Sequence, residues 1–318
     1  MYDDDSDNED FSDLIIVLPT LNERIGIERV LEEFREQRIS FSKIIVVDGH
    51  STDGTIEYAQ SRGVRVILQE GRGKSDAIRT LVETLERENI NPKYVLFMDA
   101  DYTYPAKHIR DLLRKIRERH DLVIGARRYL EKGSQSALYR LGNKILTKIF
   151  NILFGTRLSD VLSGMYVVRF DILRELLFES RDFGIESEIV AHIVSTGGSV
   201  SEVPIEYRRR SDPKSKKLKI IGGVKILADM IRLAWSYNPT FLIFAGGSLL
   251  LVPGLILGAY VGYHYLFTGI VYHVKGLIAI VSSLAGFQSL LLALLSLYLK
   301  RSEIRIMREI RKLRAWRD

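Results

Sequence analysis

Two long uncharged segments near the carboxyl end constrain this chain more than any other feature. Residues 241–267 contain no Asp, Glu, Lys or Arg, and residues 276–299 contain none either. Each segment exceeds the roughly 20 residues that an α-helix needs to cross the hydrocarbon core of a bilayer. Buried core helices are also apolar, but they seldom lack charge on every face. We therefore expect two transmembrane helices within residues 240–300.

Basic residues flank this hairpin on both sides. Those before the first span are Arg208, Arg209, Arg210, Lys214, Lys216, Lys217, Lys219, Lys225 and Arg232, and those after the second are Lys300, Arg301, Arg305, Arg308, Arg311, Lys312, Arg314 and Arg317. The loop between the spans offers only His273 and Lys275. The positive-inside tendency predicts a multi-pass protein of the cell membrane, with both the amino-terminal domain and the basic tail at 301–318 on the cytoplasmic side. Basic charge beside apolar spans fits anionic lipid headgroups better than nucleic acid.

Residues 218–239 have apolar side chains at helical spacing and charges elsewhere around the turn. The apolar positions are Ile220, Ile221, Val224, Leu227, Met230, Ile231 and Ala234. This pattern favours an amphipathic helix in the membrane interface. A helix packed against the preceding domain would show the same pattern.

The remainder of the chain predicts one α/β domain over residues 13–217, after an acidic, disordered tail at 1–12. Apolar runs predict buried strands at Leu14–Leu18, Ile44–Val47, Val64–Leu68 and Tyr94–Met98, and helical spacing predicts helices at Glu28–Gln37, Gly54–Arg62 and Lys74–Glu88. Alternating strands and helices indicate a mostly parallel, Rossmann-like sheet with helices on both faces. The chain has no cysteine, which excludes disulfides and thiol nucleophiles.

Polar clusters follow three of these strands. They occupy Thr20–Glu23, Asp48–Thr55 and Asp99–Tyr104. Ligands of such sheets bind outside the carboxyl ends of the strands. One cluster could be accidental, but three predict a lined crevice.

The most informative cluster is Asp99-Ala100-Asp101, directly after a predicted strand. Two carboxylates separated by one residue can share Mg²⁺ or Mn²⁺, which prefer oxygen ligands and keep coordination sites open for phosphates. Such a pair alone is more often a solvated turn. Its position after two other polar strand ends favours a metal site that would hold a diphosphate.

With these segments together, the sequence resembles the family 2 glycosyltransferases of GT-A fold, and within them the dolichyl-phosphate sugar synthases. The likeness rests on Leu18-Pro-Thr-Leu-Asn-Glu23, Val47-Asp-Gly-His-Ser-Thr-Asp-Gly-Thr55 and the Asp99–Asp101 triplet, and it extends over about residues 13–300. Gly49-His50 and Phe183–Glu188 look most similar to the archaeal enzymes that start N-linked S-layer glycans on dolichyl phosphate.

The resemblance implies a donor site and a metal site. By similarity, the donor nucleotide-sugar is held by Pro19, Leu21, Glu23, Asp48, Lys74, Asp76, Asp99, Ala100, Asp101, Arg127, Arg210 and Lys216, and Mg²⁺ or Mn²⁺ by Asp99, Asp101 and Thr103. The chain departs from the family pattern at Gly49, which replaces an Asp, at Pro213, which replaces a Gly, and at Thr103, which replaces a Gln that is a better ligand.

The resemblance also implies the reaction, which is inverting transfer of a hexose or N-acetylhexosamine from a UDP-sugar to dolichyl or polyprenyl phosphate, for protein glycosylation. A phosphate acceptor needs no general base, but the site must offset the charge of two anions brought together. We expect the metal at Asp101 and the side chains of Arg127, Arg140, Arg210 and Lys216 to do this.

Other functions remain open at this point. One is transfer to a hydroxyl group of a glycolipid or saccharide, with Glu186 or Glu188 as the base. Another is a GDP-mannose-dependent dolichyl-phosphate mannose synthase. A sugar-1-phosphate nucleotidyltransferase would typically carry a glycine-rich, Arg-containing loop where Pro19–Glu23 stands. A membrane scaffold with an idle nucleotide fold would not need the paired aspartates.

Overall fold

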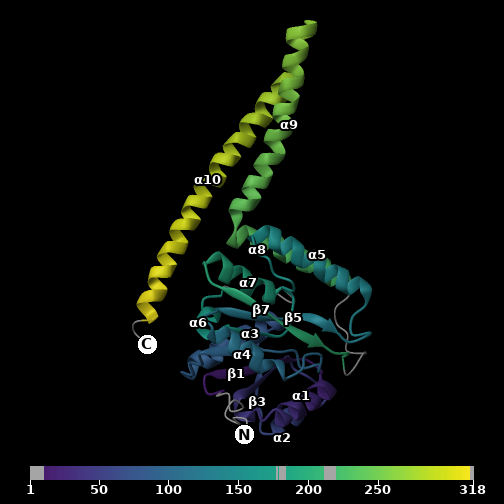
Figure 1. The fold of residues 1–318 in the computed structure, drawn as a ribbon, viewed down its shortest axis with the longest axis vertical. Helices are drawn as coiled ribbons and strands as arrows, with labels where there is room; N and C mark the ends of the chain where they lie inside the picture. The colour runs from purple at the N-terminus through teal and green to yellow at the C-terminus, as the bar shows by residue number, and fades with distance from the viewer. Residues whose placement is uncertain (1–10, 177, 179–183, 211–219, 316–318) are drawn as a thin grey trace, which may run out of the picture. The chain divides into compact units, whose positions relative to one another are not determined.

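A computed structural model describes residues 11–176, 178, 184–210 and 220–315 (Figure 1). The chain forms two compact units. The first comprises Met1–Val194 and Gly198–Ile231, and the second comprises Ser195–Gly197 and Arg232–Asp318. Most of the predicted acidic tail, the segment around Lys216 and the last three residues of the basic tail lie outside the described residues.

The first unit is built on a seven-stranded sheet in the order β3-β2-β1-β4-β6-β5-β7. The strands are β1 (Leu14–Thr20), β2 (Ile44–Asp48), β3 (Arg65–Leu68), β4 (Tyr94–Phe97), β5 (Leu122–Leu130), β6 (Tyr166–Arg169) and β7 (Val200–Tyr207). Strand β1 pairs in parallel with β2 and β4, β2 with β3, and β5 with β7. Only β6 runs antiparallel to its neighbours among these described strands. The predicted mostly parallel sheet is confirmed.

Helices cover both faces of this sheet. They are α1 (Arg24–Glu36), α2 (Thr55–Ser61), α3 (Lys74–Arg87), α4 (His108–Arg117), α5 (Ala137–Phe154), α6 (Phe170–Leu173) and α7 (Ile185–Ser195), with a short 3₁₀ turn, η1 (Phe41–Lys43). Ile16 and Leu18 of β1 share a buried core with apolar residues of α1 and α4. Val17 points to the opposite face because side chains alternate along a strand, and α3 contacts β1 and β2.

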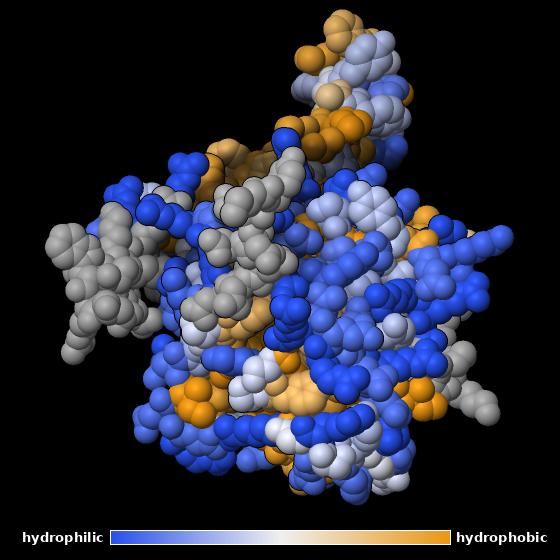
Figure 2. Space-filling view, turned by 60° about the horizontal axis from the view of Figure 1, so that its bottom comes forward, coloured by the Kyte–Doolittle hydropathy of each residue, from blue (hydrophilic) through white to orange (hydrophobic). Residues whose placement is uncertain are grey.

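The chain reverses its direction across the sheet between β1 and β4. Strands β2 and β3 follow β1 on one side, and β4 then returns to pair with β1 on the other. The segments after these two strands diverge and leave a crevice between them, which is where ligands bind in open α/β sheets. Leu21–Glu23 and Asp99–Asp101 occupy these two positions. Elsewhere, Figure 2 shows a face of the unit on which hydrophilic residues dominate.

The second unit contains two long helices, α9 (Pro239–Thr268) and α10 (His273–Ala315), which lie side by side (Figure 1). Polar groups join them, because Ser289 Oγ donates to the Ile243 carbonyl oxygen at 3.1 Å and the Thr240 and Ser296 hydroxyls lie 2.7 Å apart. Their most apolar windows are only 11% and 17% buried within the structure, unlike those of core helices. Length and composition therefore suit two membrane spans, and α10 continues as a helix well past the predicted end at 299.

Helix α8 (Ile220–Tyr237) matches the helix predicted at 218–239. Met230 is fully buried, whereas Val224, Ile231 and Trp235 are exposed apolar side chains. Helix α8 therefore exposes apolar side chains, and its placement in a membrane interface stays a prediction.

Candidate active site

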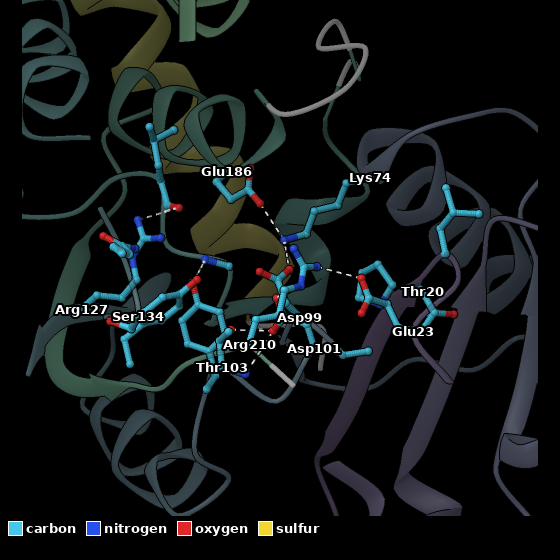
Figure 3. Close-up of a pocket in the computed structure, with 18 of the residues that line it drawn as sticks. Thr20, Glu23, Lys74, Asp99, Asp101, Thr103, Arg127, Ser134, Glu186 and Arg210 are labelled. Carbon is cyan, nitrogen blue, oxygen red and sulfur yellow. Dashed lines mark hydrogen bonds and ion pairs between the residues drawn. The ribbon is translucent and has the colours of Figure 1, made fainter. Parts of the chain in front are cut away.

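A cavity of about 640 Å³ opens at the crevice between β1 and β4, and all its lining residues belong to the first unit. This volume is in the range of small-molecule sites. Ten of the predicted site residues line it, namely Pro19, Leu21, Glu23, Lys74, Asp99, Ala100, Asp101, Thr103, Arg127 and Arg210. Figure 3 shows most of their side chains.

Asp99 and Asp101 enter the cavity from the segment directly after β4. The backbone N–H and the hydroxyl of Thr103 both donate to Oδ1 of Asp101. Burial and the neighbouring charge of Asp99 raise the pKa of Asp101, and Arg210 and Thr103 partly oppose this shift. The structure thus holds two carboxylates close together at a cost, and Thr103 supports Asp101.

Lys74, the first residue of α3, points into the cavity from the side opposite Thr103 (Figure 3). Its ammonium lies 2.7 Å from Oδ1 of Asp99 and 2.7 Å from Oε1 of Glu186, which is in the first turn of α7. Burial by itself would lower the pKa of Lys74, but Asp99 and Glu186 raise it well above its ordinary value. Lys74 is therefore held as a cation, and it connects the start of α3 to α7 and to the segment after β4.

Arg210, three residues past β7, is a second cation beside the carboxylate pair. Its Nη2 donates to Oε1 of Glu23 at 2.7 Å, and its Nε lies 3.1 Å from Oδ2 of Asp101. Arg210 therefore connects the segments that follow β1 and β4 across the crevice.

Arg127 of β5 lines the cavity with a guanidinium that is already engaged. Its Nε and Nη2 donate to the two carboxylate oxygens of Asp160, each at 2.7 Å, and Nη2 also donates to the Leu162 carbonyl oxygen at 3.0 Å. Both side chains of this pair are about one-tenth exposed. Burial opposes the charge, but Tyr104 and Asp160 raise the pKa of Arg127 well above its usual range. Fork-to-fork geometry fixes this guanidinium firmly.

Three predicted residues lie away from the cavity lining. Asp48 is fully buried, and its carboxylate accepts hydrogen bonds from the Thr20 hydroxyl and from the backbone and hydroxyl of Ser51. Asp76 accepts a hydrogen bond from the Gly71 backbone N–H. Arg140 is exposed on α5. The first two hold loops beside the site, and direct ligand contacts for all three stay predictions.

Lys216 lies outside the described residues. Conversely, sequence reasoning did not single out several cavity residues. Gln69 directly follows β3 and is 6% exposed, so the rule that found the other strand ends could have found it. Tyr139 lines the cavity from the same helix as Arg140. Tyr104, the last residue of the predicted Asp99–Tyr104 cluster, and Tyr207 also line the cavity, although neither was assigned a role there.

The carboxylate pair fits a hard divalent cation. Mg²⁺ is usually held by one or two carboxylates, and water and substrate phosphates complete its coordination. No cluster of three His, Cys, Asp or Glu residues suited to a metal occurs in the described part of the chain, and a metal held by Asp99 and Asp101 stays a prediction. In this structure Lys74 pairs with Asp99, and Arg210 lies beside Asp101.

Solved structures share this fold. Glucosyl-3-phosphoglycerate synthase from Mycobacterium tuberculosis, solved in complex with UDP, superposes with a TM-score of 0.55 over 70% of this chain and 79% of that chain, at 20% identity. The same synthase solved with Mn²⁺, UDP-glucose and phosphoglyceric acid also gives a TM-score of 0.55, at 21% identity.

Sequence comparisons find relatives of higher identity. Glycosyltransferase AglJ of Haloferax volcanii is 33% identical over 88% of this chain and 91% of its own length. The dolichyl-phosphate hexose transferase of the same organism is 30% identical over 70% of this chain and 94% of its own. The model for "Glycosyl transferase family 2" matches residues 15–177, about half of the chain. The chain is therefore an enzyme that belongs to glycosyl transferase family 2.

Proposed function

We propose that the enzyme transfers a hexose or N-acetylhexosamine from a UDP-sugar to dolichyl or polyprenyl phosphate, with inversion at the anomeric carbon. The observation that carries this proposal is the charge pattern of the cavity. Lys74, Arg127 and Arg210 line the same cavity as Asp99 and Asp101. A site that brings an anionic acceptor to an anionic donor needs such a set of fixed cations.

The relatives support the acceptor. One Haloferax volcanii relative is named a dolichyl-phosphate hexose transferase, and a relative from Micrococcus luteus, 27% identical over 66% of this chain, is named an undecaprenyl-phosphate mannosyltransferase. The exposed apolar helices α9 and α10 suit an enzyme that meets its acceptor at a bilayer. By the positive-inside tendency, the first unit and the C-terminus face the cytoplasm.

The fold neighbours support the donor and the metal, because their titles name UDP, UDP-glucose and Mn²⁺ or Mg²⁺. In this chain Asp99 and Asp101 would hold the cation, which neutralises the donor diphosphate when bound. Pro19 and Leu21 line the end of the cavity after β1, where the nucleoside would lie. A GDP-mannose donor is the second candidate.

The side chains account for the remaining steps of transfer. An acceptor phosphate oxygen attacks the anomeric carbon, and the bond from that carbon to the nucleoside diphosphate breaks. The attacking oxygen carries no proton, so the reaction does not require a side chain to act as a base. The guanidinium of Arg210 stays near the reacting anions through its contact with Glu23, and Asp160 fixes that of Arg127. Both groups can therefore stabilise charge without reorganising during the reaction.

A hydroxyl acceptor is the main alternative, and it requires a base. Glu186 lines the cavity, but its Oε1 already pairs with Lys74 at 2.7 Å. Glu188 is fully buried and does not line this cavity. These contacts favour the phosphate acceptor.

The test is an assay of the full chain in detergent with Mn²⁺, a panel of UDP- and GDP-sugars, and either dolichyl phosphate or a glycolipid, with the lipid product weighed by mass spectrometry. We expect dolichyl phosphate and a UDP-sugar to give product, and both Asp101→Asn and Arg210→Ala to reduce transfer by about 10²-fold or more. Arg114→Ala is the matched control, because that exposed arginine on α4 is no part of the cavity lining. Near-normal transfer in both site variants, or product only from the hydroxyl acceptor, would contradict the proposal.

A further inference from the structure

Each of the two aspartates in the cavity has a basic partner that is also bound to a second carboxylate. Lys74 contacts Asp99 and Glu186, both at 2.7 Å. Arg210 contacts Asp101 at 3.1 Å and Glu23 at 2.7 Å. Figure 3 shows Lys74 reaching between Glu186 and Asp99. The same arrangement therefore occurs twice around one site, built from segments far apart in the sequence.

Glu186 is well placed to control Lys74. The side chains of Lys74 and Glu186 are only 14% and 10% exposed, whereas that of Asp99 is 37% exposed. Water and salt screen charge interactions less at buried positions. The Lys74–Glu186 ion pair is therefore weakened less by solvent than the Lys74–Asp99 pair. The backbone of Glu186 is held in the first turn of α7, whereas Asp99 lies in a segment outside any helix or strand.

A divalent cation at Asp99 would compete with the ammonium of Lys74. Oδ1 of Asp99 is occupied by Lys74 in this structure, and a positive ion placed on the same carboxylate would repel the ammonium. A buried lysine without a counter-charge is costly, so Lys74 needs another carboxylate when it leaves Asp99. Glu186 provides that carboxylate without requiring a large movement, because it already touches Lys74.

We propose that Glu186 is a positioning residue that retains Lys74 when a divalent cation takes Asp99, and thereby raises the affinity of the site for that cation. This inference rests on the metal site in the proposed function and adds residues that set its affinity. Glu23 is placed to do the same for Arg210 beside Asp101.

The test measures Mn²⁺ binding to the full chain in detergent, without donor or acceptor, by calorimetry. The variants are Glu186→Gln, Lys74→Met and the double variant. We expect Glu186→Gln to weaken Mn²⁺ binding. Of the two carboxylates that pair with Lys74, this variant leaves only that of Asp99, so Lys74 competes more strongly with Mn²⁺ for it. Lys74→Met should strengthen binding, because the competitor is removed.

The double variant separates this mechanism from simple loss of a negative charge. Removal of the Glu186 charge acts directly on a nearby cation in either background, whereas its effect through Lys74 requires Lys74. We therefore expect Glu186→Gln to weaken Mn²⁺ binding by a factor at least about threefold larger in the wild-type background than in Lys74→Met. An equal or larger factor in the Lys74→Met background would overturn the inference.

Two controls accompany the cycle. Glu83→Gln removes one negative charge from an exposed position of α3, the helix that begins at Lys74, and should leave Mn²⁺ affinity unchanged. Thermal unfolding of each variant shows whether it is folded. The measurement also separates this inference from the acceptor assignment, because it needs no transfer. Failure to transfer sugar to dolichyl phosphate would leave it standing, whereas absence of Mn²⁺ binding to the wild-type chain would overturn it.

Discussion

The carboxylate of Asp99 fills the space that a Cβ atom at Gly164 would occupy, so a side chain at residue 164 would overlap with it. Gly164 is itself held in place, because its backbone N–H donates to the hydroxyl of Tyr104 at 2.7 Å. The side-chain direction of Asp99 therefore depends on the absence of a side chain 65 residues further along the chain.

Gly164→Ala should displace Asp99 and reduce metal-dependent transfer by about tenfold to a hundredfold, because small misplacements of an active-site group have effects of this size. The measurement is the rate of sugar transfer as Mn²⁺ is varied. Gly142→Ala is the matched control, since a Cβ atom there meets no other atom within 4 Å. Equal rates for the two variants would show that Asp99 does not need its present position.

Asp160→Asn should lower the free energy of unfolding by about 3 kcal/mol, because it leaves the buried guanidinium of Arg127 without its counter-charge. Urea denaturation of the detergent-solubilised chain, followed by circular dichroism, measures this change. The control is Glu88→Gln, which breaks an exposed pair with Arg65 and should not shift the midpoint. A similar midpoint for both variants would mean that the Arg127–Asp160 pair does not stabilise the fold.

His108 should make the stability of the protein depend on pH. Burial lowers the pKa of His108 below its ordinary value of 6.5, and Asp111 partly opposes this. As the pH falls below 6.5, the unfolded chain therefore takes up a proton before the folded chain does, and stability is lost. His108→Gln can still accept the hydrogen bond that His108 Nε2 takes from the Glu206 N–H at 3.2 Å.

The thermal unfolding midpoint should consequently fall less between pH 7.5 and pH 5.0 in His108→Gln than in the wild-type chain. Carboxylates that titrate at lower pH are common to both proteins and cancel in the comparison. An equal fall in both would show that His108 titrates alike in the folded and unfolded chains.

The membrane topology can be tested because the chain has no cysteine. Ile270→Cys places a single thiol in the loop between α9 and α10, and Ser302→Cys places one after the second span. We expect a membrane-impermeant maleimide to label the first variant in intact cells, and the second only after permeabilisation, because basic residues flank the spans on the Ser302 side. The reverse labelling pattern would invert the proposed orientation.

Elements that depend on local sequence were predicted well. The strands at Leu14, Ile44 and Tyr94 and the two long apolar helices follow from apolar periodicity and from the absence of charge, which act over neighbouring residues. The position of the Asp99–Asp101 pair at a strand end was predictable for the same reason. The ends of the helices were harder to predict from the sequence. Helix α10, for example, continues as a charged helix to Ala315.

The sequence by itself determined which segments become strands and membrane-length helices, and which polar residues stand at the carboxyl ends of the strands, because these depend on neighbours along the chain. Only the tertiary structure decided how the charges are paired. It joined Lys74 to Asp99 and Glu186, occupied Arg127 with Asp160, and buried Asp48 behind the cavity. Such pairings depend on how strands and helices distant in sequence pack together, and no local pattern contains that information.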